Sequence, residues 1–228
     1  MFARGSFGRK VAIHGMLAVG FILLVVFLSQ WQLQAIIVMG LLMMWDELSY
    51  HGEQRLQGIG KVRSPYILYG MVLCGVIGMS LVLWLPGDYK GMFMTVAIAV
   101  VATDAAAELF GRKFGKPGTF FRRYSPNKSL LGAIGGWAIG VLTVLVMIVI
   151  WKVSHQAITP IVGYSLLAVP FLATFGDIVA SAVKRMRHID TFGATLGIET
   201  GGVLDRLDSW LPSFFVVGMA HVAAVYVG

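Results

Sequence analysis

The residues best suited to chemistry lie near the C-terminal end of the chain, between Gly176 and Trp210. This 35-residue stretch holds four aspartates, one glutamate and four Lys or Arg residues, in a chain that is 57% hydrophobic and 13% charged. Its last part, Asp205-Arg206-Leu207-Asp208, places two carboxylates one helical turn apart with an arginine between them. Carboxylates bind divalent cations and arginine binds phosphate, so this segment predicts a site for a metal ion and a phosphate group.

The first part of the same stretch has helical spacing. Asp177, Ser181, Lys184 and His188 follow one another at intervals of three or four residues, and Arg185 stands beside them. These intervals place the four side chains on one face of a helix. A basic cluster against anionic lipid is the alternative interpretation, although such a cluster does not need Asp177 and Ser181 above it.

A second group of charges comes earlier, in VATDAAAELFGRKFGK. Asp104 and Glu108 are four residues apart and share a helix face, although helix-end carboxylates also occur simply because they reach water. The segment Gly111–Lys116, with Arg112, Lys113 and Lys116, is expected to be a flexible basic loop that binds phosphates or anionic headgroups.

A third group lies at the start of a predicted helix, in RRYSPNKSLLGAIGGW. Ser125 and Lys128 bring a hydroxyl and an ammonium to a helix N-terminus, a position that favours an anion. An ordinary helix cap with a lysine reaching the interface explains the same residues equally well.

The composition predicts what must position these residues. A mean hydropathy of +0.80 over 228 residues indicates one all-α integral membrane domain. Residues 1–100 would supply N-terminal spans, and residues 101–228 the half that bears the motifs. The single cysteine, Cys74, excludes an internal disulfide and a cysteine-based metal site. We expect about seven transmembrane helices, the first one retained: Val11–Gln30, Trp31–Trp45, Tyr66–Leu85, Met92–Phe110, Ser129–Trp151, Ile158–Ser181 and Val203–Val227.

The loops between these spans predict the orientation. With a cytoplasmic N-terminus, one side receives 16 of the 18 Lys and Arg residues, and the other keeps only Lys90 and Lys152. The same side holds ten of the eleven acidic residues. We therefore expect the functional site to lie on the cytoplasmic side of the membrane. This bias explains the net charge of +7 without nucleic acid as a partner.

Together these motifs resemble the phosphatidate cytidylyltransferase (CDP-diacylglycerol synthase) family over roughly the C-terminal 60% of the chain. The resemblance rests on three ordered segments. The first is Asp104 with Gly111-Arg112-Lys113-Phe114-Gly115-Lys116. The second is Ser125-Pro126-Asn127-Lys128 with Gly132, Gly135 and Gly136. The third comprises Gly176-Asp177, Ser181, Val183-Lys184-Arg185, Asp190, Gly201-Gly202 and Asp205-Arg206-Leu207-Asp208-Ser209.

The chain departs from the family pattern at several matched positions. Ile189 replaces a usual lysine, Thr200 a usual histidine, and Leu131 a usual acidic residue. Ala105 and Ala106 replace small polar residues, and Glu108 replaces an aromatic residue. These departures keep other lipid acceptors open.

The resemblance implies that CTP condenses with phosphatidic acid, or a related lipid phosphate, to give CDP-diacylglycerol and pyrophosphate. It implies Mg²⁺ on Asp205 and Asp208, with Asp190 and Asp177 as further ligands. The catalytic group would be Asp205, Asp208, Lys184, Arg185 and Arg206. Substrate-binding residues would be Ser125, Lys128, Ser181, Arg112, Lys116 and Asp104.

Three alternatives stay open: a CTP-dependent kinase of a polyprenol-type alcohol, a cytidylyltransferase for another lipid phosphate, and an inactive membrane protein or small transporter. The expected location is the bacterial inner membrane, among membrane lipids and with the active site facing the cytoplasm. Small residues in the fifth span would permit a homodimer.

Overall fold

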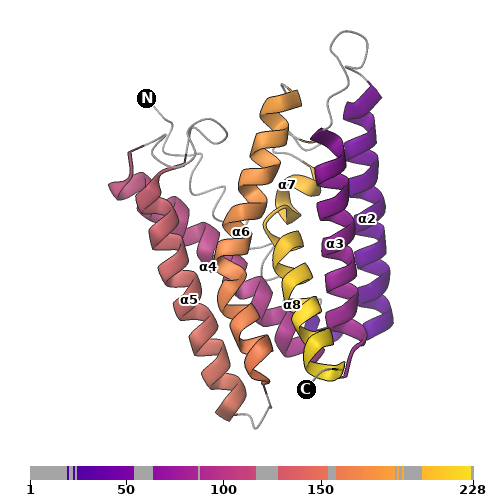
Figure 1. Ribbon diagram of the computed structural model, residues 1–228, viewed down its shortest axis with the longest axis vertical. Coiled ribbons are helices and arrows are strands. Elements are labelled where there is room, and N and C mark those ends of the chain that lie inside the picture. Colours follow the sequence, from indigo (N-terminus) through magenta and orange to yellow (C-terminus); the bar gives the residue numbers. More distant parts are fainter. Residues whose placement is uncertain are drawn as a thin grey trace.

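The computed structural model describes residues 20, 23, 25–53, 64–86, 88–116, 128–153, 158–187, 189, 192 and 202–226. Within these ranges every regular element is an α-helix, which confirms the predicted all-α fold. The helices, shown in Figure 1, are α2 (Gln30–Glu53), α3 (Ser64–Trp84), α4 (Tyr89–Phe114), α5 (Leu130–Val153), α6 (Pro160–Arg187), α7 (Leu204–Leu207) and α8 (Trp210–Tyr226).

Four helices of the described chain are long and apolar enough to cross a bilayer: Tyr66–Trp84, Tyr89–Phe114, Leu130–Lys152 and Pro160–Met186. α8 is also apolar but has only 17 residues. α2 has 24 residues but is not among these four helices. The architecture is that of a polytopic membrane protein. The predicted count of seven spans is not confirmed, and most of the first predicted span, Val11–Gln30, lies outside the described residues.

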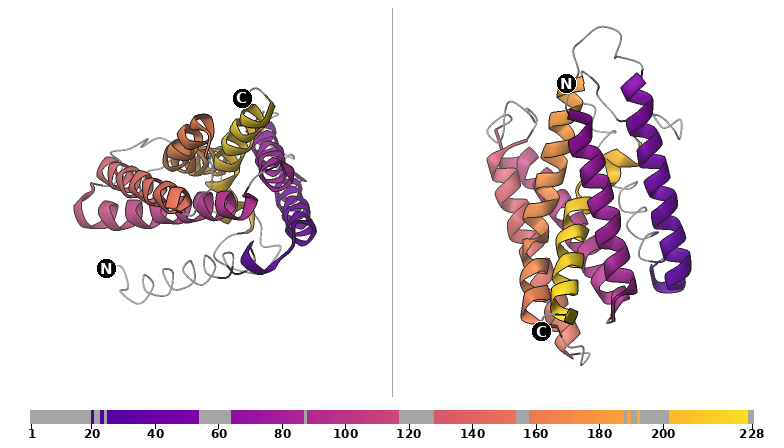
Figure 2. Two further views of the ribbon diagram at one scale, coloured as in Figure 1. Left: turned by 90° about the horizontal axis from the view of Figure 1, so that it is seen from below. Right: turned by 45° about the vertical axis from the view of Figure 1, so that its right-hand side comes forward.

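The helices form two groups that meet at α6. α4 packs along α5, while α3 packs along both α2 and α8; α6 contacts α4 and α5 on one side and α8 on the other. Figure 2 shows this from below, with α4 and α5 at one side and α2, α3 and α8 at the other. The short α7 is hydrogen-bonded to both α6 and α2.

Glycines bring the backbones of neighbouring helices close together. A Cβ on Gly132 would lie 2.7 Å from the Ala107 carbonyl oxygen of α4, and one on Gly136 would lie 2.8 Å from the Thr103 carbonyl oxygen. Gly132 and Gly136 of α5 therefore pack against α4 within the chain. A homodimer stays a prediction.

Two predicted elements are wrong. The expected flexible loop Gly111–Lys116 is instead helix as far as Phe114, because Arg112 and Lys113 suit a helix C-terminus and Gly115 packs onto Ser129, just before α5. The expected single span Val203–Val227 is broken: α7 ends at Leu207, and the turn at Asp208 precedes α8.

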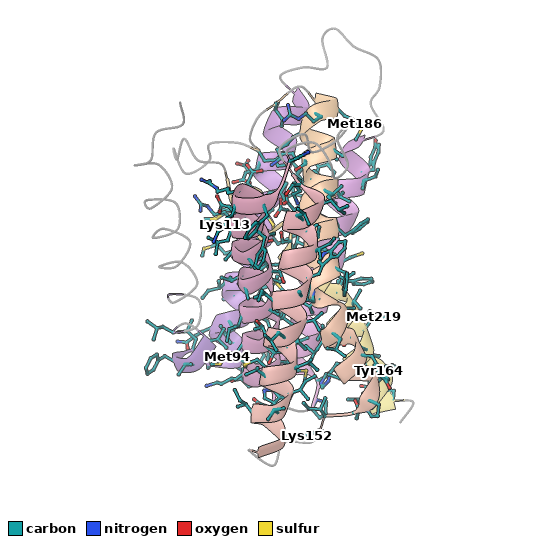
Figure 3. All side chains as sticks on the ribbon, turned by 90° about the vertical axis from the view of Figure 1, so that its left-hand side faces the viewer. Met94, Lys113, Lys152, Tyr164, Met186 and Met219 are labelled. Carbon is teal, nitrogen blue, oxygen red and sulfur yellow. The ribbon has the colours of Figure 1, made fainter. Side chains whose placement is uncertain are left out.

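The predicted distribution of charged ends fits the fold. In Figure 3 Lys113 lies in the upper half of the bundle and Lys152 at its lower end. A Cβ on Gly91 would lie 2.6 Å from the Trp151 ring, so the start of α4 meets the end of α5. Lys90 and Lys152 consequently share the end that was expected to be nearly free of charge.

Candidate functional site

An ion pair joins α6 to α7. Lys184 Nζ donates to Asp205 Oδ1 at 2.8 Å, and both side chains are largely buried. The other carboxylate oxygen of Asp205 accepts the backbone N–H of Phe192 at 2.9 Å. The Lys184 ammonium also lies 5.6 Å from the centre of the Phe192 ring. Two residues predicted for the site are therefore in direct contact.

A second ion pair joins α6 to Lys128, which lies two residues before the start of α5. Lys128 Nζ contacts Asp177 Oδ2, and Ser181 Oγ lies 3.3 Å from Asp177 Oδ1. Both charged side chains are about one-third exposed or less, so a ligand could reach them. The predicted helix face of Asp177, Ser181 and Lys184 is confirmed, because α6 continues without a break to Arg187.

Two further carboxylates complete the cluster. Asp208, in the turn after α7, is 5% exposed and interacts electrostatically with Asp177, Lys184 and Asp104. Asp104, on α4, has an exposed side chain at the edge of the cluster and interacts with Asp177, Lys128 and the Ser209 side chain. We call this set of residues the charged cluster: Asp104, Lys128, Asp177, Ser181, Lys184, Asp205 and Asp208.

The turn that carries Asp208 is sunk into the bundle. A Cβ on Gly176 would lie 2.1 Å from the Asp208 carbonyl oxygen, so only glycine permits this approach. At 1.5 Å of rise per residue, about 16 Å of α6 separates Gly176 from the helix end at Arg187. Asp208 accepts the Ser209 N–H at 2.7 Å, which fixes the turn. The charged cluster therefore lies below the end of α6 rather than in a surface loop.

The other predicted residues are not members of this cluster, and some lie outside the described residues. Arg112 pairs with Glu108 at the exposed end of α4, Lys116 follows it, and Arg185 is exposed near the end of α6. Arg206 is part of α7 and partly buried. Three predictions lie outside the described residues: Ser125, His188 and Asp190.

The charged cluster does not form a metal site as it stands. Carboxylate oxygens suit Mg²⁺, but Asp177 and Asp205 are each paired with a lysine. Within the described ranges, no group of three or more His, Cys, Asp or Glu side chains could hold a metal ion. Magnesium stays a prediction, and we assign no step of a reaction to it.

Sequence reasoning missed Glu47 of α2. Its side chain is fully buried, and both of its oxygens accept backbone N–H groups at the start of α7. The signal was an acidic residue adjoining an apolar run, because burying such a charge is costly and marks a functional position. Asp46 beside it is exposed, and the sequence alone does not distinguish the two.

Comparison with known proteins identifies the family of the chain. A family model described as "Cytidylyltransferase family" matches residues 7–224. Proteins named phosphatidate cytidylyltransferase from Mycobacterium leprae, Bacillus subtilis and Thermotoga maritima are 39%, 35% and 35% identical over 132, 117 and 126 residues. These alignments cover 58%, 50% and 52% of this chain, but only 40%, 41% and 43% of the relatives. The match to the family model includes nearly the whole chain, and the protein therefore belongs to the cytidylyltransferase family.

Proposed function

We propose that the protein condenses CTP with phosphatidic acid to form CDP-diacylglycerol and pyrophosphate. The observation that carries the proposal is the pair of lysines, Lys128 and Lys184, that reach one partly buried cluster of aspartates in an apolar bundle from distant parts of the chain. Family membership and the names of the relatives support the same reaction.

In this reaction a phosphate oxygen of the lipid attacks the α-phosphorus of CTP. The new bond joins that oxygen to the α-phosphorus, and the bond from the α-phosphorus to the oxygen bridging to the β-phosphorus breaks. Pyrophosphate carries away the electron pair, so the protein needs no nucleophile of its own. Its work is to position two polyanions and to neutralise charge.

Ion pairs with aspartates position both lysines for binding phosphate groups. Paired with Asp177 and Asp205, their ammonium groups stay in place until phosphates compete for them. The apolar faces of the surrounding helices would keep the acyl chains in the bilayer while the headgroup reaches the charged cluster. We place that cluster towards the cytoplasmic side of the bacterial inner membrane, where CTP is available.

The test is product formation by purified protein in mixed micelles with magnesium, labelled CTP and phosphatidic acid. We expect CDP-lipid and pyrophosphate in equal amounts. If folded protein gives neither, a panel of a polyprenol alcohol and other lipid phosphates decides between the alternative reactions. No product from any acceptor would refute the enzymatic proposal.

A further inference from the structure

Glu47 connects the N-terminal part of the fold to the charged cluster. It lies on α2, which packs chiefly against α3, and its side chain has 0% exposure beside the buried Met44 and Leu48. Val203 N–H donates to Glu47 Oε1 at 2.7 Å, and Leu204 N–H donates to Oε2 at 2.9 Å. Each carboxylate oxygen thus accepts an N–H at the start of α7.

These bonds satisfy donors that the short helix cannot satisfy itself. The first N–H groups of a helix have no partner within it, and a carboxylate is the acceptor best matched to them. Burial strengthens such charge-assisted bonds and also makes their loss costly, because the N–H groups would remain without acceptors.

The backbone around Glu47 is shaped to admit it. A Cβ on Gly202 would lie 2.2 Å from Glu47 Oε1 and 2.5 Å from the Phe192 carbonyl oxygen. Gly202 N–H donates to that same carbonyl at 3.0 Å. The missing side chain at Gly202 therefore lets the Glu47 carboxylate and the Phe192 carbonyl both approach the same backbone position.

A continuous set of hydrogen bonds then leads to the charged cluster. Phe192 accepts from Gly202 and donates its own N–H to Asp205, which accepts from Lys184 through its other oxygen. Glu47 fixes Val203 and Leu204, and Asp205 follows directly in α7. A shift at residue 203 would move Asp205 with it, and Asp208 one turn later.

We propose that Glu47 is a positioning residue, whose carboxylate holds the start of α7 so that Asp205, Lys184 and Asp208 keep their geometry. This inference rests on the proposed function, since it gives that geometry a catalytic use. Glu47 itself would touch neither substrate.

The experiment compares Glu47→Gln and Glu47→Ala with the unchanged protein. Glutamine keeps one carbonyl acceptor but turns an N–H₂ group towards the second backbone donor, whereas alanine removes both acceptors. Gln34→Ala is the matched control, because Gln34 lies on the same helix and accepts a hydrogen bond from Trp84 at 3.2 Å, away from the cluster.

Hydrogen exchange of the peptide 202–209 is the first readout, and it does not depend on activity. We expect faster exchange at Val203 and Leu204 in both variants, greater for alanine, and no change in Gln34→Ala. Unchanged exchange in both Glu47 variants would overturn the proposal. The exchange measurement tests the proposal even if the unchanged protein makes no CDP-lipid. Absence of CDP-lipid would refute the proposed function and not the role of Glu47 in holding α7.

Kinetics per folded molecule is the second readout. Displacement of reacting groups by about 1 Å costs on the order of a hundredfold in rate, so we expect kcat to fall by about tenfold to a hundredfold. Glu47→Gln should lie between Glu47→Ala and the unchanged protein. A loss of folded protein with kcat per folded molecule unchanged would show a merely structural role and overturn the proposal.

Discussion

Lys184 and Asp205, which are 21 residues apart in the chain, form a largely buried ion pair with an Nζ to Oδ1 distance of 2.8 Å. The second oxygen of Asp205 is bonded to the Phe192 N–H. One aspartate therefore fixes both a cation on α6 and the backbone of the segment that returns to α7. The pair is thus part of the architecture of the site as well as of its charge.

Asp205→Asn and Lys184→Met should each lower turnover by at least about a hundredfold, because each leaves a charge without its partner and displaces the other. Each should also destabilise the protein by roughly 1–3 kcal/mol, less than a fully buried pair would cost. Initial rates and thermal unfolding in detergent measure the two effects. Normal turnover in both variants would contradict the assignment.

The control for this prediction is Asp88→Asn. Asp88 caps the N-terminus of α4 at the opposite end of the bundle, accepting the Gly91 N–H at 3.1 Å. Asparagine is an equally good cap, so stability and turnover should both stay nearly unchanged.

Lys128 and Asp177 should behave as a coupled pair. Lys128→Met removes a cation that phosphates would need, so we expect KM for CTP or for the lipid to rise by about tenfold or more. Asp177→Asn alone leaves Lys128 without its carboxylate. If the two act together, the double variant should lose less free energy of unfolding than the sum of the single variants. Additive losses would show that the contact contributes nothing.

Lys152→Met is the matched control for Lys128→Met, because Lys152 is exposed at the other end of the bundle. The same substitution there should leave KM for both substrates unchanged. A comparable rise in KM would mean that the effect of Lys128 is one of overall charge.

Local spacing made part of the site predictable. Asp177, Ser181 and Lys184 depend only on α6 being helical, and three- and four-residue intervals fix their shared face. The break at Asp208 could not be predicted in this way, because hydropathy averages the turn with the apolar residues of α8. What places that turn is the approach of the Asp208 carbonyl to Gly176, a contact between distant parts of the chain.

Glu47 shows the same limit more clearly. Its partners are 156 and 157 residues away in the sequence, and no local pattern connects α2 to α7. The prediction of a flexible loop at Gly111–Lys116 is wrong for a related reason. A glycine that admits a neighbouring helix and a glycine that loosens a loop look identical in one sequence.

Turnover should require a divalent cation, because two polyanionic substrates meet at a cluster that already contains four aspartates. EDTA should abolish CDP-lipid formation, and added magnesium should restore it. The same titration should leave thermal unfolding of the substrate-free protein unchanged, since the carboxylates of Asp177 and Asp205 are already paired with lysines. Full turnover in EDTA would contradict the magnesium prediction.

Gly176→Ala tests whether the sunken turn matters for function. The added methyl group would lie 2.1 Å from the Asp208 carbonyl oxygen and 2.9 Å from the Pro212 ring, so α6 and the turn must move apart. We expect a loss of roughly 1–3 kcal/mol of stability and a larger loss of turnover, because Asp208 moves directly. Gly70→Ala is the control, since a Cβ at Gly70 on α3 meets nothing within 4 Å and should stabilise the helix slightly. If Gly176→Ala keeps full turnover despite its altered packing, the exact position of Asp208 does not limit the reaction.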